Sequence, residues 1–174
     1  MANIILPPQY LEHIESPLIF LAGPIQGAYD WQSKAIDLIS KKAPDLYIAS
    51  PRRNLRAKYS KGDFTAELYA EQVDWETFHL RKAGENGVVL FWLAKEFEHH
   101  CDRAYAQTTR FELAEWKVRH ERDKSKLVIG IEEGFTNAKY IRRRFSQDCQ
   151  DIIIRQTLED TCNDAINLAK KNKI

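Results

Sequence analysis

Cysteine is scarce in this chain, with three among 174 residues, at positions 101, 149 and 162. An odd number of widely spaced cysteines fits reduced thiols better than a disulfide framework. His99 and His100 precede Cys101, but adjacent residues seldom point at one ion, and no second pair of ligands follows at zinc-site spacing. We therefore expect neither a disulfide nor a metal site.

An excess of charge of one sign is also absent. The 26 lysines and arginines and the 25 aspartates and glutamates leave a net charge of +1, which disfavours a surface that coats polymeric nucleic acid. The first residues lack the basic start and apolar core of a signal peptide, and no apolar run approaches the ~18 residues of a membrane span. We expect a cytoplasmic protein without membrane contact, folded as a single domain over residues 1–174.

Several catalytic motifs are missing too. The chain contains no Gly-x-Ser-x-Gly elbow, His-Glu-x-x-His helix, Cys-x-x-Cys pair, P-loop or dinucleotide-binding fingerprint. Their absence disfavours acyl transfer, zinc-dependent hydrolysis and thiol redox chemistry. No cofactor is expected.

The sequence does have a regular alternation of apolar runs and helical stretches. Five short runs without polar alternation are typical of buried strands, at 17–22, 46–49, 87–93, 126–130 and 151–154. Helical patterns follow them, at about 31–39, 65–83, from 109 onward, 138–145 and 158–169. This order predicts an α/β fold with a doubly wound, five-stranded parallel sheet, a flavodoxin-like or Rossmann-like three-layer sandwich.

In such a sheet, ligands bind at the carboxyl ends of the strands. The loop after the first strand contains two glycines, which permit close approach of the backbone to a ligand. Its residues are Gly23, Pro24, Ile25, Gln26 and Gly27. We predict that this loop contacts substrate; the alternative is that Gly23-Pro24 is only a turn.

Glu112 is the most informative acidic residue, because it lies at a helix start just after the strong strand signal and an irregular loop. A carboxylate in the first helical turn is stabilised by the macrodipole, and it is a usable nucleophile for an electron-poor anomeric carbon. Thr109 and Glu112 also have the spacing of a capping box, a purely structural alternative. Arg110 either orients an anionic group or is exposed, while Glu115 has the i, i+4 spacing for an ion pair with Arg119.

Asp74 lies on an acidic face of the long helix 65–83, and such faces are usually only solvated. Helical spacing places Tyr69, Val73 and Leu80 on a face that can pack on the sheet. Asp74 is a candidate for catalysis only if the fold brings it beside Glu112.

Four short segments occur in a telling order: Ile19–Ile25 with Trp31 downstream, Val73–Trp75, Val88–Leu93 and Thr109–Trp116. Together they resemble the nucleoside 2-deoxyribosyltransferase family, particularly its deoxyribosyltransferase-like branch, over about Leu18 to Ile131. The resemblance implies cleavage or transfer at the N-glycosidic bond of a small-molecule nucleoside or nucleotide, by double displacement with retained configuration.

The resemblance also implies roles for single residues. Glu112 matches the nucleophilic glutamate that forms a glycosyl-enzyme ester, and Asp74 matches the aspartate that assists the leaving base. The loop 23–27 would hold the sugar, with Trp92 and Arg110 as further substrate contacts. The acceptor is either a second base or water. A homo-oligomer is implied as well, because family members complete their sites across subunits.

Two departures from the family pattern widen the choice of substrate. The second aspartate before the nucleophile has no counterpart in Tyr105–Gln107, which leaves only Asp102 at a distance. Arginines 142–144 fall where the family has a sugar-contacting asparagine, so Arg143 is predicted to bind a 5′-phosphate; a solvated helix turn is the alternative. A nucleotide N-glycosidase is therefore a candidate. An NAD glycohydrolase and a non-catalytic nucleotide-sensing module are candidates as well.

Overall fold

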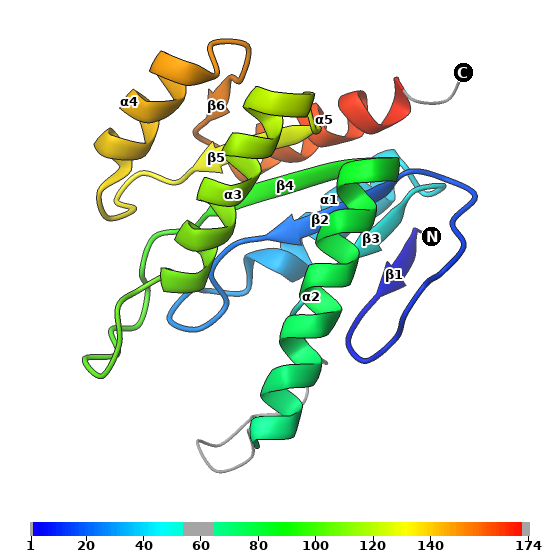
Figure 1. The fold of residues 1–174 in the computed structure, drawn as a ribbon, viewed down its shortest axis with the longest axis horizontal. Coiled ribbons are helices and arrows are strands. Elements are labelled where there is room, and N and C mark those ends of the chain that lie inside the picture. The colour runs from blue at the N-terminus through cyan, green and yellow to red at the C-terminus, as the bar shows by residue number, and fades with distance from the viewer. Residues whose placement is uncertain (1, 54–64, 172–174) are drawn as a thin grey trace.

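Six parallel strands form one sheet with helices on both faces (Figure 1). The computed structural model describes residues 2–53 and 65–171, so part of the basic stretch between β3 and α2, residues 54–64, lies outside the described residues. The strands are β1 (Asn3–Ile5), β2 (Leu18–Ala22), β3 (Tyr47–Ala49), β4 (Gly87–Leu93), β5 (Leu127–Ile131) and β6 (Ile154–Arg155). The helices are α1 (Trp31–Lys42), α2 (Ala66–Asn86), α3 (Gln107–Asp123), α4 (Ala138–Asp148) and α5 (Leu158–Lys170).

The strand order is β1-β3-β2-β4-β5-β6, and every pairing is parallel. Without the edge strand β1, this is the order of a flavodoxin-like doubly wound sheet, so the predicted fold class is confirmed. The predicted number of five strands was wrong, because β1 adds a sixth by pairing with β3. β1 carries no periodic signal, since it has three residues of which only Ile5 is buried.

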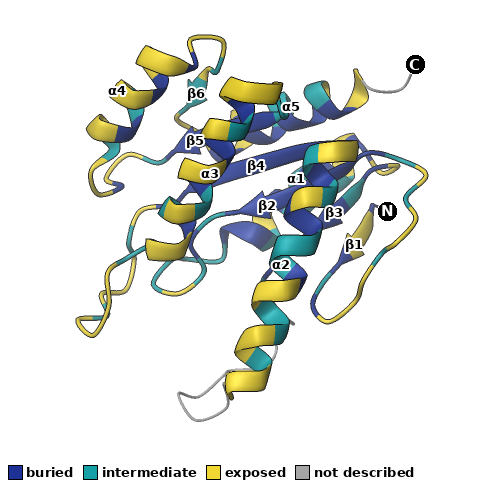
Figure 2. Ribbon diagram, in the orientation of Figure 1, coloured by how far each residue is buried: buried dark blue, intermediate teal, exposed yellow. Residues whose placement is uncertain are grey.

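Alternation along β4 divides the core into two halves. Val89 and Phe91 pack with residues of α2, α3 and α4, whereas Leu90 and Trp92 pack with residues of α1 and α5. All seven residues of β4 are buried, as the dark strands in the middle of Figure 2 show. A strand covered on both faces reads as a continuous apolar run, which explains why this part of the fold was predictable.

The side of α2 that faces the sheet differs from the predicted one. Its buried residues are Trp75, His79, Leu80 and Ala83. Tyr69 and Val73 are 58% and 41% exposed, so the prediction was wrong for both. Trp75 fixes the rotation of the helix, because its indole is fully buried and Nε1 donates to the carbonyl of Gln9 (2.6 Å).

The connections that follow β2 and β4 leave the sheet in opposite directions. β2 leads through α1 to β3, and β4 leads through α3 to β5, so the strand order reverses between β2 and β4. In doubly wound sheets, ligands usually bind at such a reversal, outside the carboxyl ends of the two strands. α2 and α3 cover the same face beside this edge (Figure 1).

Candidate active site at the carboxyl edge of the sheet

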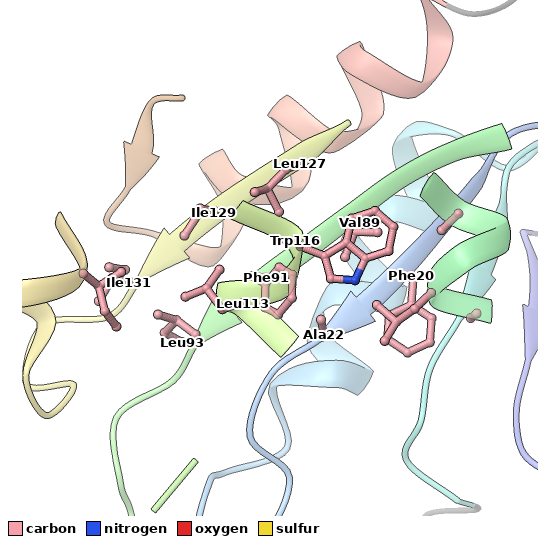
Figure 3. Packing of buried hydrophobic residues seen from close by; sticks show 14 of the residues in the cluster. Phe20, Ala22, Val89, Phe91, Leu93, Leu113, Trp116, Leu127, Ile129 and Ile131 are labelled. Carbon is pink, nitrogen blue, oxygen red and sulfur yellow. The ribbon is translucent and has the colours of Figure 1, made fainter. Parts of the chain in front are cut away.

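Glu112 lies in the second turn of α3. The helix begins at Gln107, after Ala106 in the left-handed conformation (φ 56°), and no side chain caps it. The predicted capping box was therefore wrong, because Thr109 is a buried residue inside the helix and not its cap. The next residue, Leu113, points onto the sheet (Figure 3) and holds this turn in place. The position of Glu112 thus has no capping explanation.

Burial decides the protonation of Glu112. It raises the pKa of the carboxyl group from 4.5 to about 8, and the charges of Glu76 and Glu115 add to the rise. The macrodipole was expected to keep this carboxylate ionised, but its effect falls off within the first turn. That expectation was wrong, because Glu112 lies beyond the first turn and is half-buried. With a pKa of about 8, Glu112 favours the protonated form at neutral pH.

Glu76 on α2 is the second carboxyl group of this region. Burial raises its pKa, against the opposing effects of the Gln72 hydrogen bond and the Arg53 charge. Gln72 Nε2 donates both to Glu76 Oε1 (2.7 Å) and to the carbonyl of Pro51 (2.8 Å). Arg53 Nε in turn donates to Gln72 Oε1 (2.8 Å). The segment after β3 therefore fixes the Glu76 side chain through Gln72.

Two half-buried carboxyl groups in one region favour different protonation states. Each charge disfavours the other, so the pair retains a proton to higher pH than either group would alone. One group can then act as an acid while the other acts as a base or nucleophile. Glu112 and Glu76 have the chemical requirements of such a pair.

The charges that act on Glu112 are those of Glu76 and Glu115 and not that of Asp74, whose catalytic role stays a prediction. Two residues along a helix differ by roughly 200° in direction, so Asp74 faces away from the side of α2 that carries Glu76. Asp74 is exposed, and it borders an open cavity of about 390 Å³ on the outer side of the helix. The cavity is also lined by Thr77, Phe78, Arg81, Lys82 and Glu85.

Sequence reasoning missed Glu76, Gln72 and Arg53. The sequence did contain a signal for Gln72 and Glu76. Gln72 lies three residues before Trp75 and Glu76 lies four residues before Leu80, so helical spacing places both on the side of α2 that carries these buried residues. Arg53 gave no such signal, since its contact with Gln72 joins segments 19 residues apart.

The glycine loop after β2 packs closely against protein groups. The space of a Cβ at Gly23 is occupied by the carbonyl of Trp92 and the ring of Trp31. Gly27 lies against Tyr105, and its carbonyl accepts from the backbone amides of residues 97 (2.8 Å) and 98 (3.0 Å). The loop is thus a compact turn that joins the segments after β2 and β4. Its predicted contact with substrate stays a prediction, for Pro24, Ile25 and the exposed Gln26 as well.

Trp92 is part of the core on the other face of the sheet from Glu112. Its side chain packs with residues of α1 and α5, and only 2% of the residue is exposed. Nε1 donates to the hydroxyl of Tyr29 at 3.3 Å. Adjacent strand residues alternate between the two faces, so Phe91 and not Trp92 faces α3. Contact of Trp92 with substrate stays a prediction that its burial does not favour.

The two arginines predicted to bind substrate differ in their surroundings. Arg110 is half-buried, its Nη2 donates to the carbonyl of Thr136 (2.7 Å), and its guanidinium lies 4.5 Å from the ring centroid of Phe135. Arg143 is exposed on α4, whereas the neighbouring Arg142 turns toward the carbonyl of Ile131 at the end of β5 (3.4 Å). Arg110 therefore joins α3 to the segment after β5.

We expect Arg110→Met to lower the free energy of unfolding by about 1–2 kcal/mol, because it removes the hydrogen bond to Thr136 and the stacking on Phe135. Arg143→Met is the matched control and should change stability by less than about 0.5 kcal/mol. Urea denaturation of both variants measures the difference. Equal stability of the two variants would show that Arg110 does not hold the loop.

Three further observations concern the described residues. No group of three His, Cys, Asp or Glu side chains is arranged there to hold a metal ion. Cys101, Cys149 and Cys162 are free thiols, as predicted, and burial raises the pKa of Cys162 to about 12. No helix in this part of the chain is long and apolar enough to cross a membrane.

Comparison with protein-family models gives a match over the part of the chain that contains Glu112 and Glu76. The family model described as "Nucleoside 2-deoxyribosyltransferase like" matches residues 16–135, which include β2, β4, α2 and α3. No curated protein sequence matches the chain significantly. The matched span covers more than half of the 174 residues. The chain therefore belongs to the nucleoside 2-deoxyribosyltransferase-like family.

Proposed function

We propose that the protein cleaves the N-glycosidic bond of a small-molecule nucleoside or nucleotide, with Glu112 as the nucleophile. The observation that carries this proposal is the half-buried Glu112 carboxyl group beside the carboxyl edge of a doubly wound sheet. Its raised pKa supports the same role, because strongly perturbed carboxyl groups cluster at catalytic sites. Family membership supports the choice of bond.

The reaction would proceed in two displacements. The Glu112 carboxylate forms a bond to C1′ of the sugar while the C1′–N bond breaks, and the bonding electron pair leaves with the base. Water or a second base then attacks C1′ and displaces Glu112. Two inversions at C1′ give overall retention. Because Glu112 is protonated in the ligand-free protein, it has to lose this proton before it attacks.

The test is a panel of nucleosides, their 5′-monophosphates and NAD, incubated with the protein and analysed for free base by chromatography. We expect at least one compound to release its base. Addition of a second base separates transfer, which yields a new nucleoside, from hydrolysis, which yields free sugar. A panel without any released base would contradict the proposal.

A second candidate function is nucleotide binding without catalysis. The proton on Glu112 favours it, since a neutral carboxyl group is a poor nucleophile. Calorimetric titration with the same panel distinguishes the two. Binding of a compound without release of its base supports the binding module and excludes catalysis on that compound.

A further inference from the structure

We propose that Glu76, and not Asp74, is the acid that protonates the leaving base, and that Glu76 and Glu112 exchange one proton to start the reaction. This inference rests on the proposed function. It assigns a role to a residue that neither the family match nor the sequence patterns single out.

The arrangement of α2 and α3 places the two carboxyl groups together. Both helices run from the carboxyl to the amino edge of the sheet, since α2 leads into β4 and α3 follows it. They touch at Gly84, where the ring of Trp116 fills the space of a Cβ. Glu112 lies one turn before Trp116, and Glu76 about two turns before Gly84. Both glutamates therefore lie on the carboxyl side of this contact, close enough for their charges to interact.

Glu76 is anchored by Gln72 at one of its two carboxyl oxygens. Gln72 donates to Oε1 (2.7 Å), and no other hydrogen bond to this carboxyl group occurs within the described part of the chain. Gln72 cannot reorient freely, because Pro51 and Arg53 engage both ends of its amide. A carboxyl group with one anchored and one available oxygen suits directed proton transfer. The anchoring also makes Glu76 more than a solvated residue of the helix surface.

The proposed steps balance in protons and electrons. In the proposed starting state the pair holds one proton on Glu112, and this proton passes to Glu76 when substrate binds. Glu112 then attacks C1′, the C1′–N bond breaks, and the departing base takes the Glu76 proton on a ring nitrogen. In the second step, water attacks C1′ and gives a proton to Glu76, while the ester bond to Glu112 breaks. The pair ends with the one proton it had at the start.

The experiment compares leaving groups that need an acid with one that does not. A neutral purine base must be protonated as it leaves, whereas an N7-methylated purine already carries a positive charge. We expect Glu76→Gln to slow base release from the neutral nucleoside by about 10²-fold or more, and from its N7-methylated form by less than roughly tenfold. The amide oxygen of the variant can still accept from Gln72, so the fold should persist. Glu85→Gln, an exposed change on the same helix, is the control.

A second readout does not depend on activity. Carbon-13 NMR of labelled glutamate carboxyl groups follows the titration of Glu112, which should shift to lower pH in Glu76→Gln because a charged neighbour is replaced by a neutral one. An unchanged Glu112 titration would show that the two groups do not exchange a proton.

The outcomes separate failure of this inference from failure of the proposed function. If the wild-type protein releases base and Glu76→Gln slows both substrates equally or neither, Glu76 is not the acid, while cleavage itself stands. If Asp74→Asn shows the selective loss instead, the acid is Asp74. If the wild-type protein releases base from no compound of the panel, the proposed function fails and the acid role fails with it.

Discussion

Glu112→Gln is expected to lower base release by about 10³-fold or more, because the amide cannot form the glycosyl-enzyme ester. The same change should raise the free energy of unfolding at pH 8. Burial and the charges of Glu76 and Glu115 make the ionised form of Glu112 costly in the folded protein, and glutamine of nearly equal shape removes that cost. Activity and stability should thus change in opposite directions.

The pH dependence of the stability change follows from the pKa of Glu112. The folded value of about 8 lies above the ordinary 4.5, so between these two the folded protein binds more protons than the unfolded chain, and stability falls as pH rises. A shift of one unit corresponds to about 1.4 kcal/mol, and we expect Glu112→Gln to stabilise the protein by about 4 kcal/mol at pH 8 and by little at pH 4.5. Denaturant unfolding at both values measures this difference.

Glu115→Gln is the matched control for Glu112→Gln. Glu115 lies on the same helix, is exposed, and forms the predicted ion pair with Arg119 (2.8 Å). Such exposed pairs contribute about 0.2–1 kcal/mol to the free energy of unfolding, so Glu115→Gln should lose little stability. We expect this variant to keep its activity as well. A Glu112→Gln variant that retains full activity would remove Glu112 from the mechanism. A variant that is inactive and also less stable at pH 8 would point to a structural role.

The fold could be predicted because its strongest signals are local. β2, β4 and β5 are covered on both faces, so their sequences are continuous apolar runs. Their alternation with helices leaves few topologies, and the crossover rules select the doubly wound sheet among them. The short edge strand β1 was missed since its pairing with β3 joins segments 44 residues apart in register, Asn3 with Tyr47. Such a contact leaves no periodicity in the sequence.

The site could be predicted only in part. The position of Glu112 could be predicted because its place after β4 follows from chain order. The choice between Asp74 and Glu76 could not be made from the sequence, because it depends on the rotation of α2 about its axis, which the buried indole of Trp75 sets. Apolar residues on several sides of this helix made its phase ambiguous, as the exposed Tyr69 shows. The start of α3 was misplaced for a related reason, since Thr109 fits a capping motif that the chain does not use.

Gly23→Ala is expected to lower the free energy of unfolding by about 3 kcal/mol or more, because overpacking and backbone strain add up at this position. The added Cβ would overlap the carbonyl of Trp92 and the ring of Trp31. Neither group can move easily: the Trp31 ring is fully buried and donates to the carbonyl of Pro24 (2.8 Å), and the Trp92 carbonyl belongs to the central strand. The backbone at Gly23 also has φ +155°, which residues with a side chain rarely adopt.

Gly134→Ala separates the steric part of this effect from the backbone part. Gly134 also has a positive φ (+92°), but a Cβ there would meet only the Lys95 side chain at an ordinary 3.6 Å. We expect backbone strain alone to lower the free energy of unfolding of this variant by about 1–2 kcal/mol. Urea denaturation compares Gly134→Ala with Gly23→Ala. If Gly23 instead leaves room for substrate, Gly23→Ala will unfold at the wild-type urea concentration and raise KM for the substrate found in the panel. A clear loss of stability with unchanged KM would mean that the glycine is required for packing between β2 and β4 and not for substrate binding.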